Sequence, residues 1–225
     1  MPQLGINIPA RALLRFWTMI ARCHGSIWNA ADPARSLGIG ESTVRRYLDL
    51  LTSLLVVRQL QPWHANLAKR QVKAPKVYVR DSGLLRVLLG IPTEKDLLAH
   101  PKSGASWEGY AVEQVLSKVE PDHAYFWATH QRAELDLLLF KDGCRLGVEI
   151  KRMDAPTLTP SMRIALTDLS LDKLIVLYPG SEAYELEPRV RVMPISSLIG
   201  ASIKSLFPGK RRLGDAASAG SRAAT

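Results

Sequence analysis

The sequence predicts an α/β (α+β) protein, with a helical N-terminal domain followed by a domain built on a mixed central sheet. Three observations predict this organisation. Apolar residues recur at helical spacing before residue 56. The stretch ELDLLLFKDGCRLGVEIKR, residues 134–152, alternates around Asp142-Gly143 in the manner typical of a β-hairpin. The run KLIVL, residues 173–177, is apolar throughout, which is typical of a strand in a sheet interior.

Composition and charge narrow the classes of function. The chain has 225 residues and a net charge of +9, which favours contact with a polyanion, nucleic acid first. No apolar run approaches 18 residues and the N-terminus has no cleavage pattern, so neither a membrane span nor a signal peptide is predicted. Cys23 and Cys144 are too few for a disulfide framework or a zinc knuckle, which fits a reduced, cytoplasmic location.

The N-terminal part predicts three helices followed by two strands. The helices are expected at residues 10–24, 29–36 and 41 or 42 to 55, and the strands at residues 56–60 and 76–80. Three helices and a two-stranded wing form the winged-helix plan, a helix-turn-helix variant, which we place at residues 8–90.

The third helix of this plan would occupy the recognition position, and the wing that follows it is basic. Residues 58–80 contain six Lys or Arg and no acid, so the wing would lie along a phosphate backbone. The five tryptophans are mostly expected to be packing residues, and Trp63, beside the basic loop, is the one that could stack on a base. Winged helices also serve as protein-interaction modules, and basic loops are often only solvated. The predicted nucleic-acid contacts are Thr43, Arg45, Arg46, Lys69, Arg70, Lys73 and Lys76.

The C-terminal part predicts helices at residues 84–89, 94–99, 106–119, 159–171 and 195–206, and strands at residues 123–128, 134–140, 145–151, 173–177 and 190–193. From residue 106 their order, α-β-β-β-α-β, is that of the restriction-endonuclease-like core, which we place at residues 104–207. Residues 91–103 would connect the two domains. Residues 208–225 lack apolar periodicity and are expected to be disordered.

The predicted hairpin brings chemistry-bearing side chains together. If Asp142-Gly143 is the turn, Asp136 lies directly across from Glu149, and Glu134 lies across from Lys151. Two carboxylates at that spacing repel each other unless a cation lies between them, and a hard divalent ion with oxygen ligands suits them. Lys151 would then orient a water or stabilise a developing negative charge.

An Asp followed on the next strand by Glu-x-Lys resembles the PD-(D/E)xK nuclease core, with Leu135 where that motif has Pro. The resemblance implies that Asp136 and Glu149 hold magnesium and that Lys151 assists hydrolysis of a phosphodiester. An acidic residue from a preceding helix often joins such sites. Here Glu108 is the candidate for both the catalytic and the metal-binding set, with Glu113 in reserve. Opposed acids and a lysine on an exposed hairpin also arise by chance.

A second resemblance covers about residues 13–199. The matching features are Asn66, Lys69-Arg70, Pro75-Lys76-Val77-Tyr78 and Asp81-Ser82-Gly83-Leu84, followed by Gly104, Trp107 and Glu108 and by the Glu-x-Asp and Glu-x-Lys strands. The chain is similar here to a domain of unknown function found C-terminal to AAA-type P-loop ATPases of bacteria and archaea. The resemblance implies an ATPase, or another protein, as a partner.

Two functions remain open. One is a DNA-associated, magnesium-dependent nuclease built on Asp136, Glu149, Lys151 and Glu108. The other is a non-catalytic DNA-binding or protein-interaction module, the C-terminal part of an AAA-type ATPase that lacks its ATP-binding domain. No Gly-x4-Gly-Lys-Ser/Thr motif occurs in the sequence, so the chain is not expected to hydrolyse ATP on its own.

Overall fold

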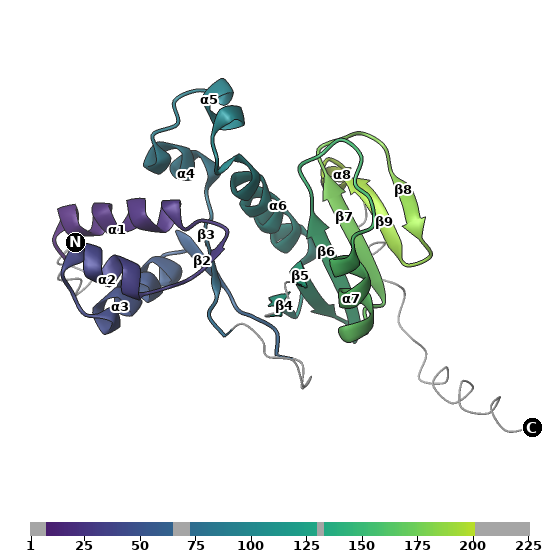
Figure 1. Ribbon diagram of the computed structural model, residues 1–225, viewed down its shortest axis with the longest axis horizontal. Coiled ribbons are helices and arrows are strands. Elements are labelled where there is room, and N and C mark those ends of the chain that lie inside the picture. The colour runs from purple at the N-terminus through teal and green to yellow at the C-terminus, as the bar shows by residue number, and fades with distance from the viewer. Residues whose placement is uncertain (1–7, 65–72, 130–132, 201–225) are drawn as a thin grey trace, which may run out of the picture. The chain divides into compact units, whose positions relative to one another are not determined.

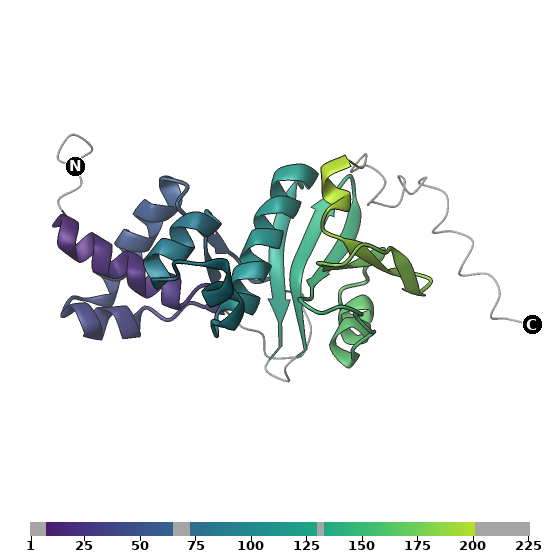
Figure 2. The same cartoon turned by 90° about the horizontal axis from the view of Figure 1, so that it is seen from above.

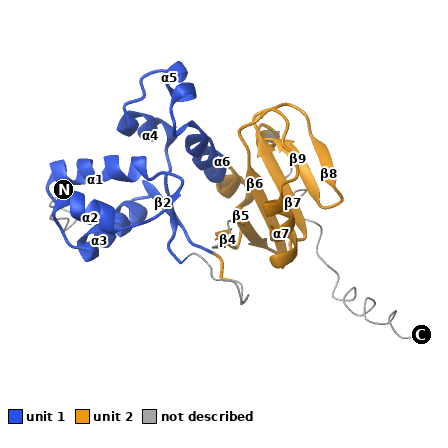
Figure 3. Ribbon diagram, in the orientation of Figure 1, with its two compact units in different colours: residues 1–62, 73–113 blue, residues 63–72, 114–225 orange. Residues whose placement is uncertain are grey.

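The computed structural model describes residues 8–64, 73–129 and 133–200. Within these residues the protein is α/β, with eight helices, a three-stranded sheet and a mixed six-stranded sheet (Figure 1). The predicted α/β class is therefore confirmed. The chain forms two compact units (Figure 3). Unit 1 comprises Met1–Pro62 and Lys73–Glu113, and unit 2 comprises Trp63–Val72 and Gln114–Thr225.

Unit 1 begins with the three predicted helices. They are α1 (Ala10–Arg22), α2 (Ala31–Leu37) and α3 (Glu41–Ser53). α2 ends at Gly38, whose left-handed conformation (φ +66°) suits a glycine at the end of a helix. α3 turns Val44, Leu48 and Leu51 into the core, as its apolar spacing predicts.

An antiparallel sheet covers these helices in the order β1-β3-β2. Its strands are β1 (Ser26–Ile27), β2 (Val57–Leu60) and β3 (Lys76–Val79). β2 and β3 match the predicted strands, whereas β1 is not predicted because two residues after a turn at Gly25 carry no alternation. Helices α4 (Ser82–Leu89) and α5 (Glu94–Ala99) follow, capped by Asp81 and Thr93.

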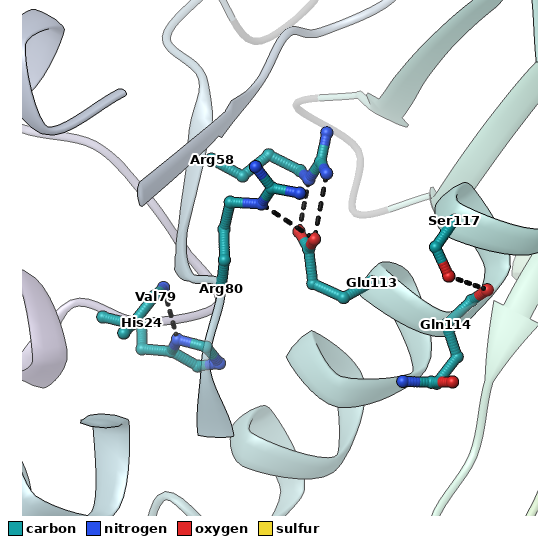
Figure 4. A network of polar contacts seen from close by, with 7 residues as sticks. All are labelled: His24, Arg58, Val79, Arg80, Glu113, Gln114 and Ser117. Atoms are coloured by element: carbon teal, nitrogen blue, oxygen red, sulfur yellow. Dashed lines mark hydrogen bonds and ion pairs between the residues drawn. The ribbon is translucent and has the colours of Figure 1, made fainter. Parts of the chain in front are cut away.

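Helix α6 (Ser103–Val119) contributes to both units, since the division falls between Glu113 and Gln114. In unit 1 its first turns pack on His24, which is 1% exposed. The Nδ1 atom of His24 accepts the N–H of Val79 (3.0 Å, Figure 4), and Nε2 lies 3.1 Å from the Ala105 carbonyl, to which it donates. Burial lowers the pKa of His24 to about 4, so this imidazole is neutral at physiological pH and acts as a structural link.

Unit 2 is built on the mixed sheet, in the strand order β4-β5-β6-β7-β9-β8. Three neighbouring strands run parallel: β6 (Cys144–Ile150), β7 (Lys173–Tyr178) and β9 (Val190–Pro194). The other three pair antiparallel with their neighbours in the sheet: β4 (His123–Ala128), β5 (Glu134–Lys141) and β8 (Tyr184–Glu187). Helix α7 (Pro160–Asp168) packs on β5, β6 and β7 (Figures 1 and 2). The short helix α8 (Ser197–Gly200) packs on β9.

The hairpin between β5 and β6 has the predicted turn and register. Asp142 and Gly143 both have positive φ, 51° and 79°, which a two-residue turn of this type requires. Lys141 pairs with Cys144 and Leu137 pairs with Val148. The register inferred from the sequence is therefore confirmed along this ladder.

Two features of unit 2 differ from the sequence analysis. β8 is a short edge strand with no buried residue, so its sequence YELE lacks an apolar signal and the strand is not predicted. The sequence suggests Trp63 as a base-stacking residue, but the structure packs its ring on Tyr125 and Phe140, at centroid distances of 5.0 and 4.8 Å. Its backbone N–H donates to the Phe126 carbonyl (2.7 Å), so Trp63 belongs to the core of unit 2.

The units differ from the predicted domains of 8–90 and 104–207 in two respects. Unit 2 includes Trp63, which lies inside the first predicted domain. Unit 1 extends through residues 91–103, where α5 lies, to Glu113 in α6. The tail at 208–225 and the end of the helix predicted at 195–206 lie outside the described residues. Across the described ranges, no helix is long and apolar enough to cross a membrane.

Gly109 of α6 should be intolerant of a side chain. A Cβ at this position would lie 2.3 Å from Nε2 of His24, whose ring is held by two hydrogen bonds. We expect Gly109→Ala to lower the free energy of unfolding by about 1–3 kcal/mol, the usual cost of overpacking. The control is Gly104→Ala in the same helix, where an added Cβ meets nothing within 4 Å. Equal denaturation midpoints for the two variants would contradict this account.

Candidate active site

Strands β5 and β6 bring two acidic side chains together in the interior of unit 2. Leu137 and Val148 are the last pair of the β5–β6 ladder, and Asp136 and Glu149 are the residues just beyond it. The N–H of Ile150 donates to Oδ2 of Asp136 (2.9 Å). Asp136 is 7% exposed and Glu149 is 2% exposed, although residues of these types are seldom buried.

Lys151 completes this group. Its ammonium lies 2.6 Å from Oε1 of Glu149, and its backbone N–H donates to the Leu177 carbonyl on β7 (2.8 Å). Three of the four predicted catalytic residues therefore lie together at the end of the hairpin. The sequence pattern found this cluster because its members lie within or directly after the two strands of one hairpin.

The electrostatics of the cluster are dominated by Glu149. Burial and the charge on Asp136 together raise the pKa of Glu149 to about 8, although the Lys151 ammonium acts in the opposite direction. Burial alone would lower the pKa of Lys151, but the carboxylates of Glu149, Asp136 and Glu134 raise it above its ordinary value. Lys151 is therefore charged at neutral pH, and Glu149 is short of favourable partners.

One atom of Glu149 is left without a partner. Its Oε2 is buried and has no hydrogen-bond partner among the described residues. A buried, unpaired carboxylate oxygen is costly and is found where an ion or a water is bound. A second carboxylate, Asp136, lies beside it, so the donor set consists of hard oxygens, which suit magnesium.

The site offers magnesium few protein ligands. Among the described residues no three His, Cys, Asp or Glu side chains are grouped to hold a metal. Magnesium is commonly bound through one or two carboxylates and keeps several waters. Asp136 and Glu149 satisfy that pattern.

Glu108, the predicted third acid, lies in unit 1, where its carboxylate has protein partners. Its Oε1 accepts a hydrogen bond from the Tyr78 hydroxyl (2.6 Å) and lies 3.2 Å from the Lys76 ammonium. These contacts account for Glu108 as a structural residue of unit 1. Its assignment to the metal site stays a prediction.

Glu113, held in reserve for the same role, is a structural acid of unit 1. It accepts hydrogen bonds from two arginines, Arg58 on β2 and Arg80 after β3, whose guanidinium groups converge on its carboxylate (Figure 4). Burial alone would raise the pKa of Glu113, but the hydrogen bonds and charges of the arginines lower it below its ordinary value.

These two acids change the interpretation of the basic hairpin between β2 and β3. Lys76 is among the predicted nucleic-acid contacts, but it is buried and its ammonium contacts Glu108, so its assignment stays a prediction that this contact does not favour. Arg58 and Arg80 likewise face Glu113. Residues 58–80 contain no acid. The acids that pair with these basic residues come from α6, more than 25 residues beyond residue 80.

The remaining predicted nucleic-acid contacts lie on α3 and before β3. Arg45 and Arg46 are exposed on α3, and Thr43 is half-buried. Arg45 makes an exposed ion pair with Glu41 (3.3 Å), which contributes little stability and leaves the guanidinium accessible. Lys73 is exposed. Lys69 and Arg70 lie outside the described residues.

A serine that the sequence did not single out anchors the start of β5. The Ser161 hydroxyl, in the first turn of α7, accepts the N–H of Glu134 (2.7 Å) and donates to the Glu134 carbonyl (2.8 Å). Glu134 is exposed, and its charge acts on both Glu149 and Lys151. A Ser-Met-Arg turn carries no motif, so only the structure reveals this anchor.

Both parts of the chain match families whose function is unknown. Residues 1–95 match the model of DUF8612, a domain of unknown function, and residues 103–198 match that of DUF4143, also a domain of unknown function. DUF4143 is commonly associated with AAA-type ATPases, which is consistent with the resemblance found in the sequence. No solved structure matches the chain significantly.

Two curated relatives are mycobacterial. The chain is 48% identical over 197 residues to Uncharacterized protein Rv2008c of Mycobacterium tuberculosis, and equally to Uncharacterized protein Mb2031c of Mycobacterium bovis. The match covers 88% of this chain and 45% of either relative, so the chain spans less than half the length of these proteins.

The contact between Glu113 and the two arginines should stabilise unit 1 in a pH-dependent way. At pH 7 we expect Glu113→Gln to lower the free energy of unfolding by about 1–3 kcal/mol, because it weakens hydrogen bonds to charged groups. The pKa of Glu113 is lower in the folded state than in the unfolded state. Its contribution is therefore complete above the unfolded pKa of about 4.3 and disappears as the pH falls through the folded value.

Urea denaturation of wild type and variant from pH 3 to pH 8 checks this expectation. The two curves should converge in acid. Glu41→Gln, which breaks only the exposed pair with Arg45, is the matched control and should cost less than about 0.5 kcal/mol. A difference between wild type and Glu113→Gln that is constant down to pH 3 would contradict the assignment.

Proposed function

We propose that this protein is a DNA-associated, divalent-metal-dependent phosphodiesterase with the PD-(D/E)xK arrangement at Asp136, Glu149 and Lys151. The observation that carries the proposal is the unpaired, buried Oε2 of Glu149 beside the buried carboxylate of Asp136. The order α6-β4-β5-β6-α7-β7 agrees with the α-β-β-β-α-β order of the restriction-endonuclease-like core and supports the same assignment.

The proposed chemistry assigns one role to each residue. Asp136 and Glu149 would hold magnesium, which when bound activates water for attack and neutralises charge on the phosphate. Asp136 is oriented for this by the Ile150 N–H. Lys151 supplies a positive charge at the site, where it can stabilise negative charge that builds on the phosphate oxygens.

We propose that unit 1 is a winged helix that supplies affinity for the duplex through α3. Three helices and the β2–β3 hairpin follow the winged-helix order, with β1 added to the sheet. Arg45 and Arg46 are exposed near the start of α3, the end that contacts DNA in helix-turn-helix proteins. Because Arg58, Lys76 and Arg80 face acids of α6, the proposed contact surface excludes them.

A second candidate function is a non-catalytic module that works with an ATPase. It is favoured by the match to DUF4143 and by relatives more than twice as long as the matched region. Such a module would bind DNA or a protein partner without cutting. The cleavage assay separates the two candidates.

The nuclease proposal predicts metal-dependent cleavage that requires the hairpin residues. We expect the protein to nick or linearise supercoiled DNA in Mg²⁺ or Mn²⁺ and not in EDTA. Asp136→Asn and Lys151→Met should each reduce the rate at least about 100-fold, since even outer-shell changes at metal sites cost 10–100-fold. Glu182→Gln removes an exposed acid of unit 2 and should cut at the wild-type rate. DNA binding without cleavage would favour the second candidate.

The proposed role of α3 predicts a salt-dependent effect. Replacing both Arg45 and Arg46 with Ala should weaken binding to a labelled duplex. It should also reduce the slope of log affinity against log salt by about 1 for each phosphate that the variant no longer neutralises. Fluorescence anisotropy over a salt series measures both quantities. Arg35→Ala, an exposed arginine of α2 paired with Asp32, is the control. An unchanged slope in the double variant would exclude α3 from the DNA interface.

A further inference from the structure

The contact between Lys151 and Glu149 creates a competition at the proposed metal site. The ammonium lies 2.6 Å from Oε1 of Glu149, the carboxylate that would also hold a divalent cation. Two cations on one small carboxylate repel each other strongly in a buried setting. Glu149 is 2% exposed, so little solvent is present to screen that repulsion. A cation that binds there must therefore displace the ammonium or bind weakly.

Glu134 is the neighbouring acceptor for the displaced ammonium. It precedes Asp136 by two residues on β5, so the two side chains leave the strand on the same face. Asp136 acts on Glu149, the carboxylate that the Lys151 ammonium contacts at 2.6 Å, so Glu134 is the next acid along this face of β5. The Glu134 charge already acts on Lys151. Its carboxylate makes no hydrogen bond or ion pair with any described residue.

The backbone of Glu134 is fixed while its side chain is exposed. Ser161 holds both the N–H and the carbonyl of Glu134, at 2.7 and 2.8 Å. α7 thereby fixes the backbone at the start of β5, while the Glu134 side chain extends toward solvent. This combination suits a residue that receives a mobile partner.

We propose that Lys151 transfers its ammonium from Glu149 to Glu134 when a divalent cation binds at Asp136 and Glu149. Glu134 is then a positioning residue, since it keeps the Lys151 charge beside the site without occupying the cation's ligand. This inference rests on the proposed metal site and concerns the chain's own response to the ion. If the transfer occurs, replacing Glu134 should change the metal affinity only while Lys151 is present.

A double-mutant cycle on Mn²⁺ affinity tests the transfer without using catalysis. The proteins are wild type, Glu134→Gln, Lys151→Met and the double variant, with affinity measured by calorimetry or by electron paramagnetic resonance. Lys151→Met should bind Mn²⁺ more tightly than wild type, because the competing ammonium is gone. Glu134→Gln should weaken binding about 10-fold in wild type and by less than about 2-fold in Lys151→Met, a coupling of the size found for residues in contact.

Two controls keep the result specific. Glu182→Gln removes a charge that does not act on Glu149 or Lys151 and should leave affinity unchanged. Thermal unfolding of each variant establishes that it is folded. If Glu134→Gln weakens Mn²⁺ binding equally in both backgrounds, Glu134 acts as a general negative charge or a ligand. The transfer is then overturned, while the metal site stands. If wild type shows no Mn²⁺ binding that Asp136→Asn abolishes, the metal site itself fails, and the transfer with it.

Discussion

The site depends on a single electrostatic constraint, the enclosure of two carboxylates at one end of a β-hairpin. The strand register gives Asp136 and Glu149 adjacent positions, and burial removes the water that would screen their repulsion. One lysine offsets only part of this cost, which is why the pKa of Glu149 is raised to about 8. The leucines of β5 and the helix α7 hold the arrangement in place. Ionisable groups kept at such a cost are typical of functional sites.

A different use of acidic residues organises unit 1. There Glu108 and Glu113 of α6 each face basic side chains of the β2–β3 hairpin, and their carboxylates bind those cations directly. Arg58, Lys76 and Arg80 of the hairpin are thus paired with acids within unit 1, whereas Arg45 and Arg46 near the start of α3 are exposed.

Local patterns predicted most of the fold and part of the site. Asp142-Gly143 determined the turn, the turn determined the register as far as Leu137 and Val148, and Asp136 and Glu149 follow directly after that pair. Contacts between distant segments could not be predicted in this way. Lys76 meets Glu108 across 32 residues and Arg58 meets Glu113 across 55 residues, and no sequence period links them. The short strands β1 and β8 carry too few residues to show alternation.

The packing of Trp63 makes unit 2 discontinuous in sequence. Its ring covers Tyr125 and Phe140, yet residues 73–113 of unit 1 separate it from them along the chain. The matched family models divide the chain between residues 95 and 103, which assigns Trp63 to the first part. A fragment that begins at residue 103 would therefore expose an aromatic pair beside the edge strand β4. Apolar surface next to an unpaired strand edge favours aggregation, so the two parts are best produced as one polypeptide.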